Sequence, residues 1–407
     1  MHTAPLDPSP LLRAGCVEFP VHHVRGGTST GLVISEHWAP RDQALREELL
    51  RHLMGLPLEG IRAGNKQITG LGRIVPTGNK VFFARLEEDG NQRRIVSTFA
   101  QLAADKAAID WSVNCGNMTA ALPLWALDTG QVESVGAGDA FEIDVFNTNT
   151  GVTAGSRMRF AADGRFVTAE IPGVDGAFPG VDLFLANPVG AKTGRLLPTG
   201  LPVDEVAGYA VSCVDVAVPM VIARAVDFGK TAQEEIEDLD ADRDFMAALR
   251  AVWVEAGLRM ALKSAGGCPM TADELAQSET IPKVCIVGPP QGAGNIAVRY
   301  FTPQTAHRSM AVSGGCCLAA AALVPGTVAH ALARGLPTVG TSFGEVDVAI
   351  ENPAGVLEAT IEARLTASGI EVRKAAYRRS TQILLRGHVP LYRASDALRN
   401  ELQTVCR

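Results

Sequence analysis

The sequence predicts an α+β protein built from two similar domains, and three observations support this. The chain has 407 residues, which exceeds one ordinary hydrophobic core, so two domains of roughly 200 residues each are expected. Strand-like runs and helical segments occur in both halves of the chain. Cys115-Gly116-Asn117 and Ser313-Gly314-Gly315 each precede an apolar helical stretch, and these two starts lie about 200 residues apart.

The N-terminal half begins with a strand, a loop, a second strand and a helix. Residues 17–24 and 32–35 have strand-like composition and flank a loop, 25–31, with three glycines and three hydroxyl side chains. Leucines on one helical face predict a helix over 41–54. A glycine-rich stretch, 64–72, then leads to a strand over 80–86. Further strands are expected at 96–102, 141–145 and 166–171.

The C-terminal half starts after a Pro-Thr-Gly-Leu-Pro linker at 198–202 and repeats this mixture of elements. Strands are expected at 206–218, 283–287, 297–301, 345–350, 357–365 and 382–389, with two helical segments within 231–260. We therefore predict an N-terminal domain of 1–195, completed by 385–407, and a C-terminal domain of 196–384.

Two short helices, 118–127 and 316–324, are apolar on every side. Such a helix is usually buried by surrounding structure, for example by a curved sheet. Pro123 is expected to bend the first helix. If the halves are duplicates, both helix N-termini face one cleft, and each can receive a carboxylate on its unpaired N–H groups. The alternative is a chance likeness between two segments rich in Ala and Gly.

The composition describes a globular protein and argues against nucleic acid as a partner. The hydrophobic fraction is 47% and the charged fraction 20%, and the net charge of −7 argues against a nucleic-acid surface. The eight cysteines lack disulfide-scaffold or zinc spacing, so reduced thiols in the cytoplasm are expected. Residues 1–10 do not form a signal peptide, and no apolar run is long enough to span a membrane. The many alanines and low charge are compatible with a homodimer.

Five motifs carry a family resemblance along nearly the whole chain, from residue 17 to 389. They are Arg-Gly-Gly-Thr-Ser at 25–29, Lys-Gln-Ile-Thr-Gly-Leu-Gly at 66–72, Asn-Cys-Gly-Asn at 114–117, Leu-Pro-Thr-Gly at 197–200 and Pro-Gly-Thr at 325–327. In this order they resemble the PrpF family, which has the diaminopimelate-epimerase-like fold. The resemblance implies two pseudo-symmetric domains, each a curved, mostly antiparallel sheet around a central apolar helix.

The resemblance also implies a function. Characterised members of the family are cofactor-independent isomerases that shift a double bond, or tautomerise, in unsaturated di- and tricarboxylates. We expect a substrate of the 4-oxalomesaconate, aconitate or methylaconitate type, and neither a cofactor nor a metal. The family's lysine and cysteine acid–base pair corresponds to Lys66 and Cys115. Thr30, where members commonly have Lys, and the altered segment 72–80 leave the acid, the stereochemistry and the pathway open.

Such an allylic shift removes a proton from a carbon activated by a conjugated carboxylate and returns one two carbons away. Burial, or the positive charge of Arg62 or Arg73, would help Lys66 to act as the base. Cys115, beside a helix N-terminus, would handle the second proton, although the two could exchange roles. Substrate binding in the cleft between the domains is expected from Thr28, Ser29, Lys80, Asn114, Gly116, Asn117, Met118, His307, Ser313, Gly314 and Gly315.

Two other functions are compatible with the fold. A racemase or epimerase of a carboxylic acid needs a second thiol, but the repeat suggests Ser313 at that place. A non-catalytic, ligand-binding descendant is disfavoured because Lys66 and Cys115 are both present. Nucleotide-dependent enzymes are poorly supported, since neither Gly-x-Gly-x-x-Gly nor a phosphate-binding loop followed by Lys-Ser/Thr occurs.

Overall fold

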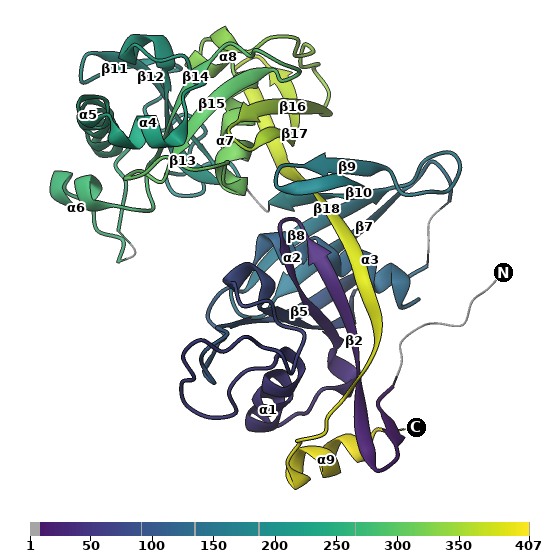
Figure 1. Ribbon diagram of the computed structural model, residues 1–407. Coiled ribbons are helices and arrows are strands. Elements are labelled where there is room, and N and C mark those ends of the chain that lie inside the picture. The colour runs from purple at the N-terminus through teal and green to yellow at the C-terminus, as the bar shows by residue number, and fades with distance from the viewer. Residues whose placement is uncertain (1–8, 91, 134–135, 186–187, 265, 407) are drawn as a thin grey trace. The chain divides into compact units, whose positions relative to one another are not determined.

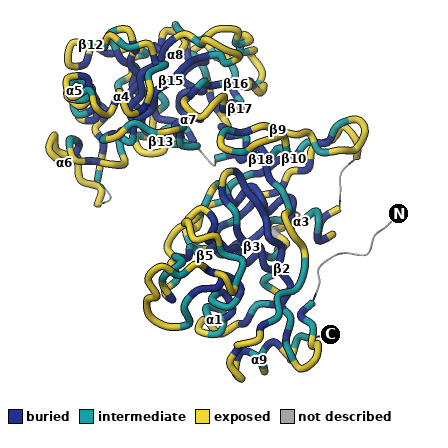
Figure 2. The backbone as a smooth tube through the Cα atoms, in the orientation of Figure 1, coloured by how far each residue is buried: buried dark blue, intermediate teal, exposed yellow. Residues whose placement is uncertain are grey.

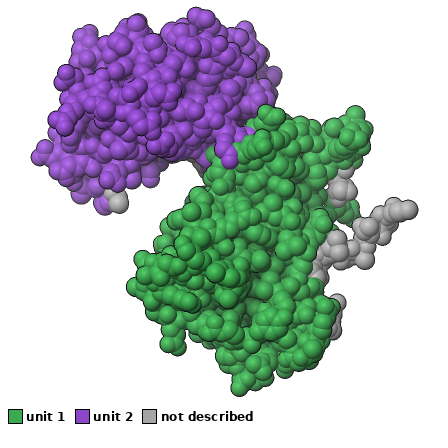
Figure 3. Space-filling view, in the orientation of Figure 1, with its two compact units in different colours: residues 1–170, 174–183, 379–407 green, residues 171–173, 184–378 purple. Residues whose placement is uncertain are grey.

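The computed structural model of the chain describes residues 9–90, 92–133, 136–185, 188–264 and 266–406. It divides into two compact units, which Figure 3 shows in different colours. Unit 1 comprises residues 1–170, 174–183 and 379–407, and unit 2 comprises residues 171–173 and 184–378. The boundaries expected at 195 and 384 for two separate domains stay a prediction. None of the described helices is long and apolar enough to cross a membrane.

Unit 1 contains a mixed, mostly antiparallel sheet (Figure 1). The pairs β2–β3, β4–β5 and β7–β8 are antiparallel, whereas β3–β4 and β5–β7 are parallel. The strands are β1 (Leu11–Arg13), β2 (Cys16–Gly26), β3 (Ser29–Ser35), β4 (Lys80–Asp89), β5 (Gln92–Leu102), β6 (Ile109–Asp110), β7 (Ala140–Asn147), β8 (Val152–Arg159), and most of β9 (Thr168–Ile171) and β10 (Val174–Leu185). The helices are η1 (Glu36–Trp38), α1 (Gln43–Met54), η2 (Pro76–Gly78), α2 (Gly116–Thr119), α3 (Ala121–Asp128) and α9 (Asp396–Gln403).

Unit 2 repeats the strand pattern of unit 1. The pairs β12–β13, β14–β15 and β16–β17 are antiparallel, and β13–β14 and β15–β16 are parallel. The strands are β11 (Asp204–Val206), β12 (Tyr209–Val216), β13 (Val218–Arg224), β14 (Lys283–Gly288), β15 (Ile296–Phe301), β16 (Gly344–Asn352), β17 (Gly355–Thr366) and the first part of β18 (Gly369–Pro390). The helices are η3 (Ala225–Phe228), α4 (Ile236–Ala241), α5 (Arg243–Arg259), α6 (Ala272–Gln277), α7 (Val312–Leu323) and α8 (Val328–Leu332).

Helices interrupt the two strand patterns at the same places. In unit 1, α1 follows β3, and α2 and α3 lie between β5 and β7. In unit 2, α4 and α5 follow β13, and α7 lies between β15 and β16. The order of parallel and antiparallel pairs is the same in both units, so the likeness predicted from two helix starts extends over six strands. The predicted α+β fold class is confirmed.

Each sheet separates two hydrophobic layers because successive side chains of a strand point to opposite faces. In β13, Met220 and Ile222 pack in the cluster that contains α7, whereas Val221 and Ala223 pack in the cluster that contains α5. Every residue from Gly314 to Leu323 of α7 is buried, and Figure 2 shows β15 of the same unit in dark blue. The apolar helix is therefore the centre of unit 2, as the sequence predicts.

The same two layers occur in unit 1. Val33 of β3 packs in the cluster around α3, whose Trp125 is fully buried. Leu32 and Ile34, its neighbours, face the other way and pack in the cluster formed with α1 and α9. Asp42 caps α1 by accepting a hydrogen bond from the backbone N–H of Leu45 at 3.0 Å, which satisfies a free donor at the helix start.

The bend expected from Pro123 is a break between α2 and α3. Pro123 has no N–H to donate to the carbonyl of Thr119, four residues earlier, and its ring crowds that carbonyl. α2 therefore ends at Thr119, and α3 starts at Ala121. This leaves a short first helix that carries the Cys-Gly-Asn motif at its start.

Helix α7 begins earlier than the predicted 316–324, so the prediction that 313–315 form a turn before the helix is wrong. Val312 is its first residue, and Ser313, Gly314 and Gly315 lie in its first turn. A Cβ at Gly314 would lie 2.5 Å from the ring of Tyr300, and one at Gly315 would lie 2.7 Å from the ring of Tyr377. Packing of two aromatic rings thus overrides the low helix propensity of glycine.

Candidate active site

The tight turn between β2 and β3 touches the start of α2. A Cβ at Gly26 would lie 2.4 Å from the backbone oxygen of Asn117, and one at Gly27 would lie 2.4 Å from its Oδ1. Only glycine lets the helix start come this close, and Gly27 also has a φ of +53°. Nδ2 of Asn117 donates to Oγ1 of Thr28 at 3.2 Å. The predicted residues Thr28 and Asn117 are therefore brought together, while Ser29 is buried in the hairpin beside them.

Cys115 is the residue that caps α2, yet its thiol makes no capping hydrogen bond. Its carbonyl accepts from both the backbone N–H and Oγ1 of Thr119, at 2.9 and 3.0 Å. Its N–H donates to Oδ1 of Asn114 at 2.7 Å. These bonds fix the backbone and leave the half-buried thiol available for chemistry.

Three predicted anion-binding groups follow Cys115 directly. Gly116, Asn117 and Met118 are the first residues of α2, and the first N–H groups of a helix have no carbonyl partner within it. Gly116 is exposed, and a Cβ there would meet open space. A carboxylate at this start would therefore find donors next to the thiol.

Lys66 lies on an exposed loop, so burial within unit 1 does not favour its neutral form, and the charge of Arg62 or Arg73 stays the predicted cause. The buried residue of the motif is Gln67, whose φ of +54° turns the chain at this point. Nε2 of Gln67 donates to the backbone oxygen of Met54 at 2.9 Å and to Oδ1 of Asn79 at 2.6 Å, and its Oε1 accepts from the N–H of Ile74 at 2.6 Å. These hydrogen bonds of Gln67, called the brace below, hold the loop in place and leave Lys66 on its surface.

Two glycines of this loop make room for the brace. A Cβ at Gly72 would lie 1.9 Å from Nε2 of Gln67, and one at Gly70 would lie 2.1 Å from the backbone nitrogen of Gly55. The sequence alone did not single out Gln67 or Asn79. The available signal was an amide residue between glycines, which marks a turn but does not reveal its partners.

Lys80 has a partner within unit 1. Its buried Nζ donates to Oε1 of Gln101 at 2.5 Å and lies 5.5 Å from the ring centre of Phe99. Nε2 of Gln101 in turn donates to the backbone oxygen of Asn79 at 3.1 Å. Lys80 therefore extends the brace of the Lys66 loop, and its role in substrate binding stays a prediction.

The other predicted binding residues lie in unit 2. Ser313 is half-buried at the start of α7, and Gly314 and Gly315 are buried behind it. The N–H of Gly315 donates to the carbonyl of Ala311 at 2.9 Å, so the expectation that this amide is open to a ligand is wrong. The residue that caps α7 is Ala311, and Ser313 is the second residue of that helix. The correspondence of Ser313 with Cys115 stays a prediction.

His307 is half-buried, and its Nδ1 accepts a hydrogen bond from the N–H of Ser309 at 3.0 Å. Burial, aided by the charge of Lys283, lowers the pKa of His307 below its ordinary value of 6.5. A lowered pKa favours the neutral imidazole, and the role of His307 in substrate binding stays a prediction. The neutral ring can still donate a hydrogen bond.

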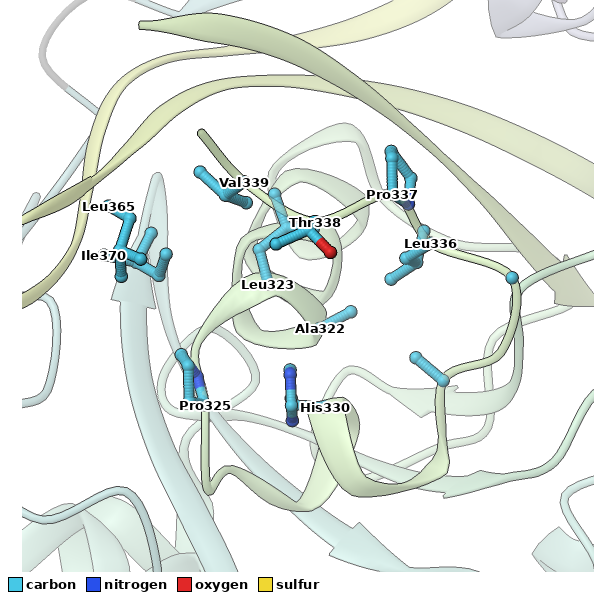
Figure 4. Close-up of a pocket in the computed structure, with 12 residues that line it drawn as sticks. Ala322, Leu323, Pro325, His330, Leu336, Pro337, Thr338, Val339, Leu365 and Ile370 are labelled. Carbon is cyan, nitrogen blue, oxygen red and sulfur yellow. The ribbon is translucent and has the colours of Figure 1, made fainter. Parts of the chain in front are cut away.

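A pocket of about 320 Å³ opens at the other end of α7 (Figure 4). It is lined mainly by aliphatic side chains, among them Leu323, Leu336, Val339, Leu365 and Ile370. None of the predicted site residues lines it. Such a lining does not suit a polyanion, because charged groups lose their hydration without gaining partners there. Within the described residues, no three His, Cys, Asp or Glu side chains are grouped as a metal site requires.

Comparison with known proteins identifies the family. Residues 16–392 match the family described as PrpF protein. The chain belongs to this family. It is 32% identical over 359 residues to a 4-oxalomesaconate tautomerase of Pseudomonas putida, which covers 86% of this chain and 90% of that protein. A (4E)-oxalomesaconate Delta-isomerase of a Novosphingobium species is 30% identical over 351 residues, covering 84% of this chain and 90% of that protein.

A solved structure agrees with this assignment to the PrpF family. The crystal structure of a methylitaconate-delta-isomerase is 25% identical, has a TM-score of 0.74 and covers 94% of this chain and 97% of its own. The predicted family and fold are confirmed. Because the related proteins are named isomerases and tautomerases, the prediction that this chain is an enzyme of the isomerase class is confirmed as well.

Proposed function

We propose that this PrpF-family protein acts on a small unsaturated di- or tricarboxylate, in which it shifts a double bond or catalyses a tautomerisation. The reaction proceeds by proton transfer, with Cys115 and Lys66 as the acid–base pair. The observation that carries this proposal is the thiol of Cys115 at the open start of α2. Relatives named for 4-oxalomesaconate favour an acid of that kind as substrate. The reaction is redox-neutral and needs no cofactor. One C–H bond breaks, and the proton returns either to a carbon two positions away in a double-bond shift or to the carbonyl oxygen in an enol tautomerisation.

The start of α2 suits the intermediate of this reaction. Removal of the first proton spreads negative charge from the carbon onto a conjugated carboxylate. The unpaired N–H groups of Gly116, Asn117 and Met118 can bind that carboxylate, and bound donors stabilise the charge that develops. The thiol of Cys115 is adjacent to these donors, so it can exchange a proton with the carbon chain of the bound acid.

The rigid loop that carries Lys66 supports a catalytic role for this lysine. Gln67 and Asn79 hold the backbone next to the lysine, while the lysine side chain stays exposed. A braced loop can deliver a flexible amine to a defined place, which lowers the entropy cost of reaching the transition state. The contribution of Ser313, Gly314 and His307 from unit 2 stays a prediction.

Isotope exchange tests the proposed reaction. The protein is incubated in D₂O with cis-aconitate, methylaconitate or 4-oxalomesaconate, and proton NMR follows deuterium entry at the allylic carbons. Cys115→Ser and Lys66→Met should each reduce the exchange rate by about 10²–10⁴-fold, the usual contribution of a positioned acid or base. The matched controls are Cys268→Ser, which removes an exposed thiol of unit 2, and Lys106→Met, which removes an exposed lysine of unit 1.

Both controls should retain the wild-type rate. Exchange at the wild-type rate in both Cys115→Ser and Lys66→Met, for every acid that the protein accepts, would refute the assigned pair. An absence of exchange with all unsaturated polycarboxylates would refute the substrate class. The racemase alternative needs a second thiol, and the predicted position of that thiol at the start of α7 carries Ser313.

A further inference from the structure

Arg25 is a buried cation next to the candidate site. It lies on β2, two residues before Gly27, and is 8% exposed. Its Nη1 donates to the backbone oxygen of Gly27 at 2.9 Å and to the backbone oxygen and Oγ of Ser380 at 3.1 and 3.2 Å. Its Nε lies 3.5 Å from Oε1 of Gln382, whereas Nη2 has no hydrogen-bond partner in the described part of the chain.

No described carboxylate balances the charge of Arg25. Arg46, another arginine of unit 1, serves for comparison. Arg25 stacks on the ring of Phe178 at 4.6 Å, and Arg46 stacks on the ring of Phe83 at the same distance. Arg46 also donates to Oε1 of Glu36 at 3.1 Å. Around Arg25 the acceptors are neutral, and burial lowers its pKa. A buried guanidinium with neutral acceptors and a free Nη2 is incomplete without an anion.

A second buried nitrogen without a partner lies on the same face of β2. His22 and Val24 face the α3 side, since Val24 packs in the α3 cluster and Nε2 of His22 lies 3.4 Å from Oδ2 of Asp128. His23 and Arg25 therefore point to the opposite face. His23 is 8% exposed, and its Nε2 has no partner among the described residues.

The loop that carries Lys66 brings a second cationic group, Arg73, close to His23. The charge of Arg73 acts on His23, whose pKa is lowered to about 4 by burial and by this arginine. His23 is thus a neutral imidazole at physiological pH, and it can donate one N–H to an oxygen. Within the described residues, neither His23 nor Arg73 forms an ion pair with a carboxylate.

We propose that Arg25 binds a second carboxylate of the substrate through Nη2, with His23 as a neutral donor and Arg73 as a nearby charge. This inference rests on the proposed function, because it assigns a group of the same polycarboxylate. The turn at Gly27 and Thr28 links this subsite to Asn117 and the start of α2. The half-buried ring of Phe178 lies over the guanidinium, so the ring must move for the acid to reach Nη2.

Calorimetry with an unreactive acid tests this subsite. Propane-1,2,3-tricarboxylate and propane-1,3-dicarboxylate are titrated into the full-length protein, because neither has a double bond to move. Arg25→Gln should weaken binding of the tricarboxylate at least tenfold and that of the dicarboxylate by less than threefold. Arg25→Lys, which keeps the charge, should recover part of the loss. The control Arg46→Gln removes an arginine of the same stacking geometry and should change neither affinity.

A purely structural Arg25 gives a different result. If it only braces the turn against Ser380, Arg25→Gln weakens both acids equally, and that outcome overturns the subsite. Unchanged tricarboxylate affinity overturns it as well. Should Arg25→Gln fail to fold, Arg73→Gln at an exposed position replaces it, with an expected three- to tenfold loss for the tricarboxylate alone. Exchange in D₂O by the wild type decides the proposed function separately, since calorimetry needs no turnover.

Discussion

The two helix starts, α2 in unit 1 and α7 in unit 2, occupy the same place in a repeated strand pattern but differ in what surrounds them. The cap of α2 is Cys115, and Gly116 behind it has open space where a Cβ would be. The cap of α7 is Ala311, and the glycines of its first turn are covered by Tyr300 and Tyr377. The start of α2 thus has a thiol and open space beside it, whereas aromatic rings pack against the first turn of α7.

The hairpins beside these helices each bury an ion, but of opposite charge. Gly26 pairs with Ser29 at the end of one hairpin, and Val216 pairs with Val218 at the end of the other, so Arg25 corresponds to Asp215. Oδ2 of the buried Asp215 accepts from the N–H groups of Lys192 and Thr193 and from Oγ1 of Thr193, at 2.8–2.9 Å. Both buried ions thus have neutral partners, and each leaves one atom without a partner among the described residues: Oδ1 of Asp215 in unit 2 and Nη2 of Arg25 in unit 1.

The largest expected difference between the two helix starts is in the rate at which their thiols are alkylated. Iodoacetamide should modify Cys115 at least about a thousandfold faster than Cys316 or Cys317 of α7, because only an accessible thiolate reacts. Both α7 thiols are fully buried, and burial raises the pKa of Cys317 well above its ordinary value. Peptide mass spectrometry of the native protein over time measures the rates.

Two other cysteines calibrate the alkylation experiment. Cys268 is exposed and should react readily, whereas Cys213 should stay unmodified because burial, chiefly, raises its pKa to about 12. Equal rates for Cys115 and Cys213 would show that the start of α2 is as closed as that of α7. Protection of Cys115 by propane-1,2,3-tricarboxylate would link the thiol to the anion site.

The two hairpins should also differ in how much they contribute to the pH dependence of folding stability. His23 corresponds to the apolar Cys213, and burial with the charge of Arg73 lowers its pKa from 6.5 to about 4. The unfolded chain therefore binds the extra proton first, so stability is complete above pH 6.5 and falls as the pH drops towards 4. The loss should approach about 3 kcal/mol. Denaturant unfolding at several pH values measures it.

His23→Phe should remove most of this decline, since phenylalanine does not titrate. His37→Phe, at an exposed position of η1, is the matched control and should retain it. A decline of the same size in His23→Phe would place the acid sensitivity elsewhere, and His23 would then be an ordinary, solvated histidine.

The sequence predicted the parts of the fold that follow from local pattern. The two helices that are apolar on every side had to be buried, and Cys115 was recognisable because glycine and asparagine follow it. The roles of Gln67 and Arg25 were not predictable, because each depends on a carbonyl or amide that is distant in the sequence, such as Ser380 for Arg25. The earlier start of α7 was missed for the same reason, since Tyr377 lies 62 residues beyond Gly315 (377 − 315).

Glycine-to-alanine variants at the two helix starts test their packing, and the expected changes in stability are the smallest of those considered. Gly314→Ala should destabilise unit 2 by about 1–3 kcal/mol, because the new methyl group would overlap the ring of Tyr300. Gly116→Ala adds the same methyl group where nothing lies within 4 Å, and alanine favours the helix by about 0.5–1 kcal/mol. Urea unfolding of both variants compares them. Equal destabilisation would mean that the start of α2 is as tightly packed as that of α7, and the open anion site would lose its structural basis.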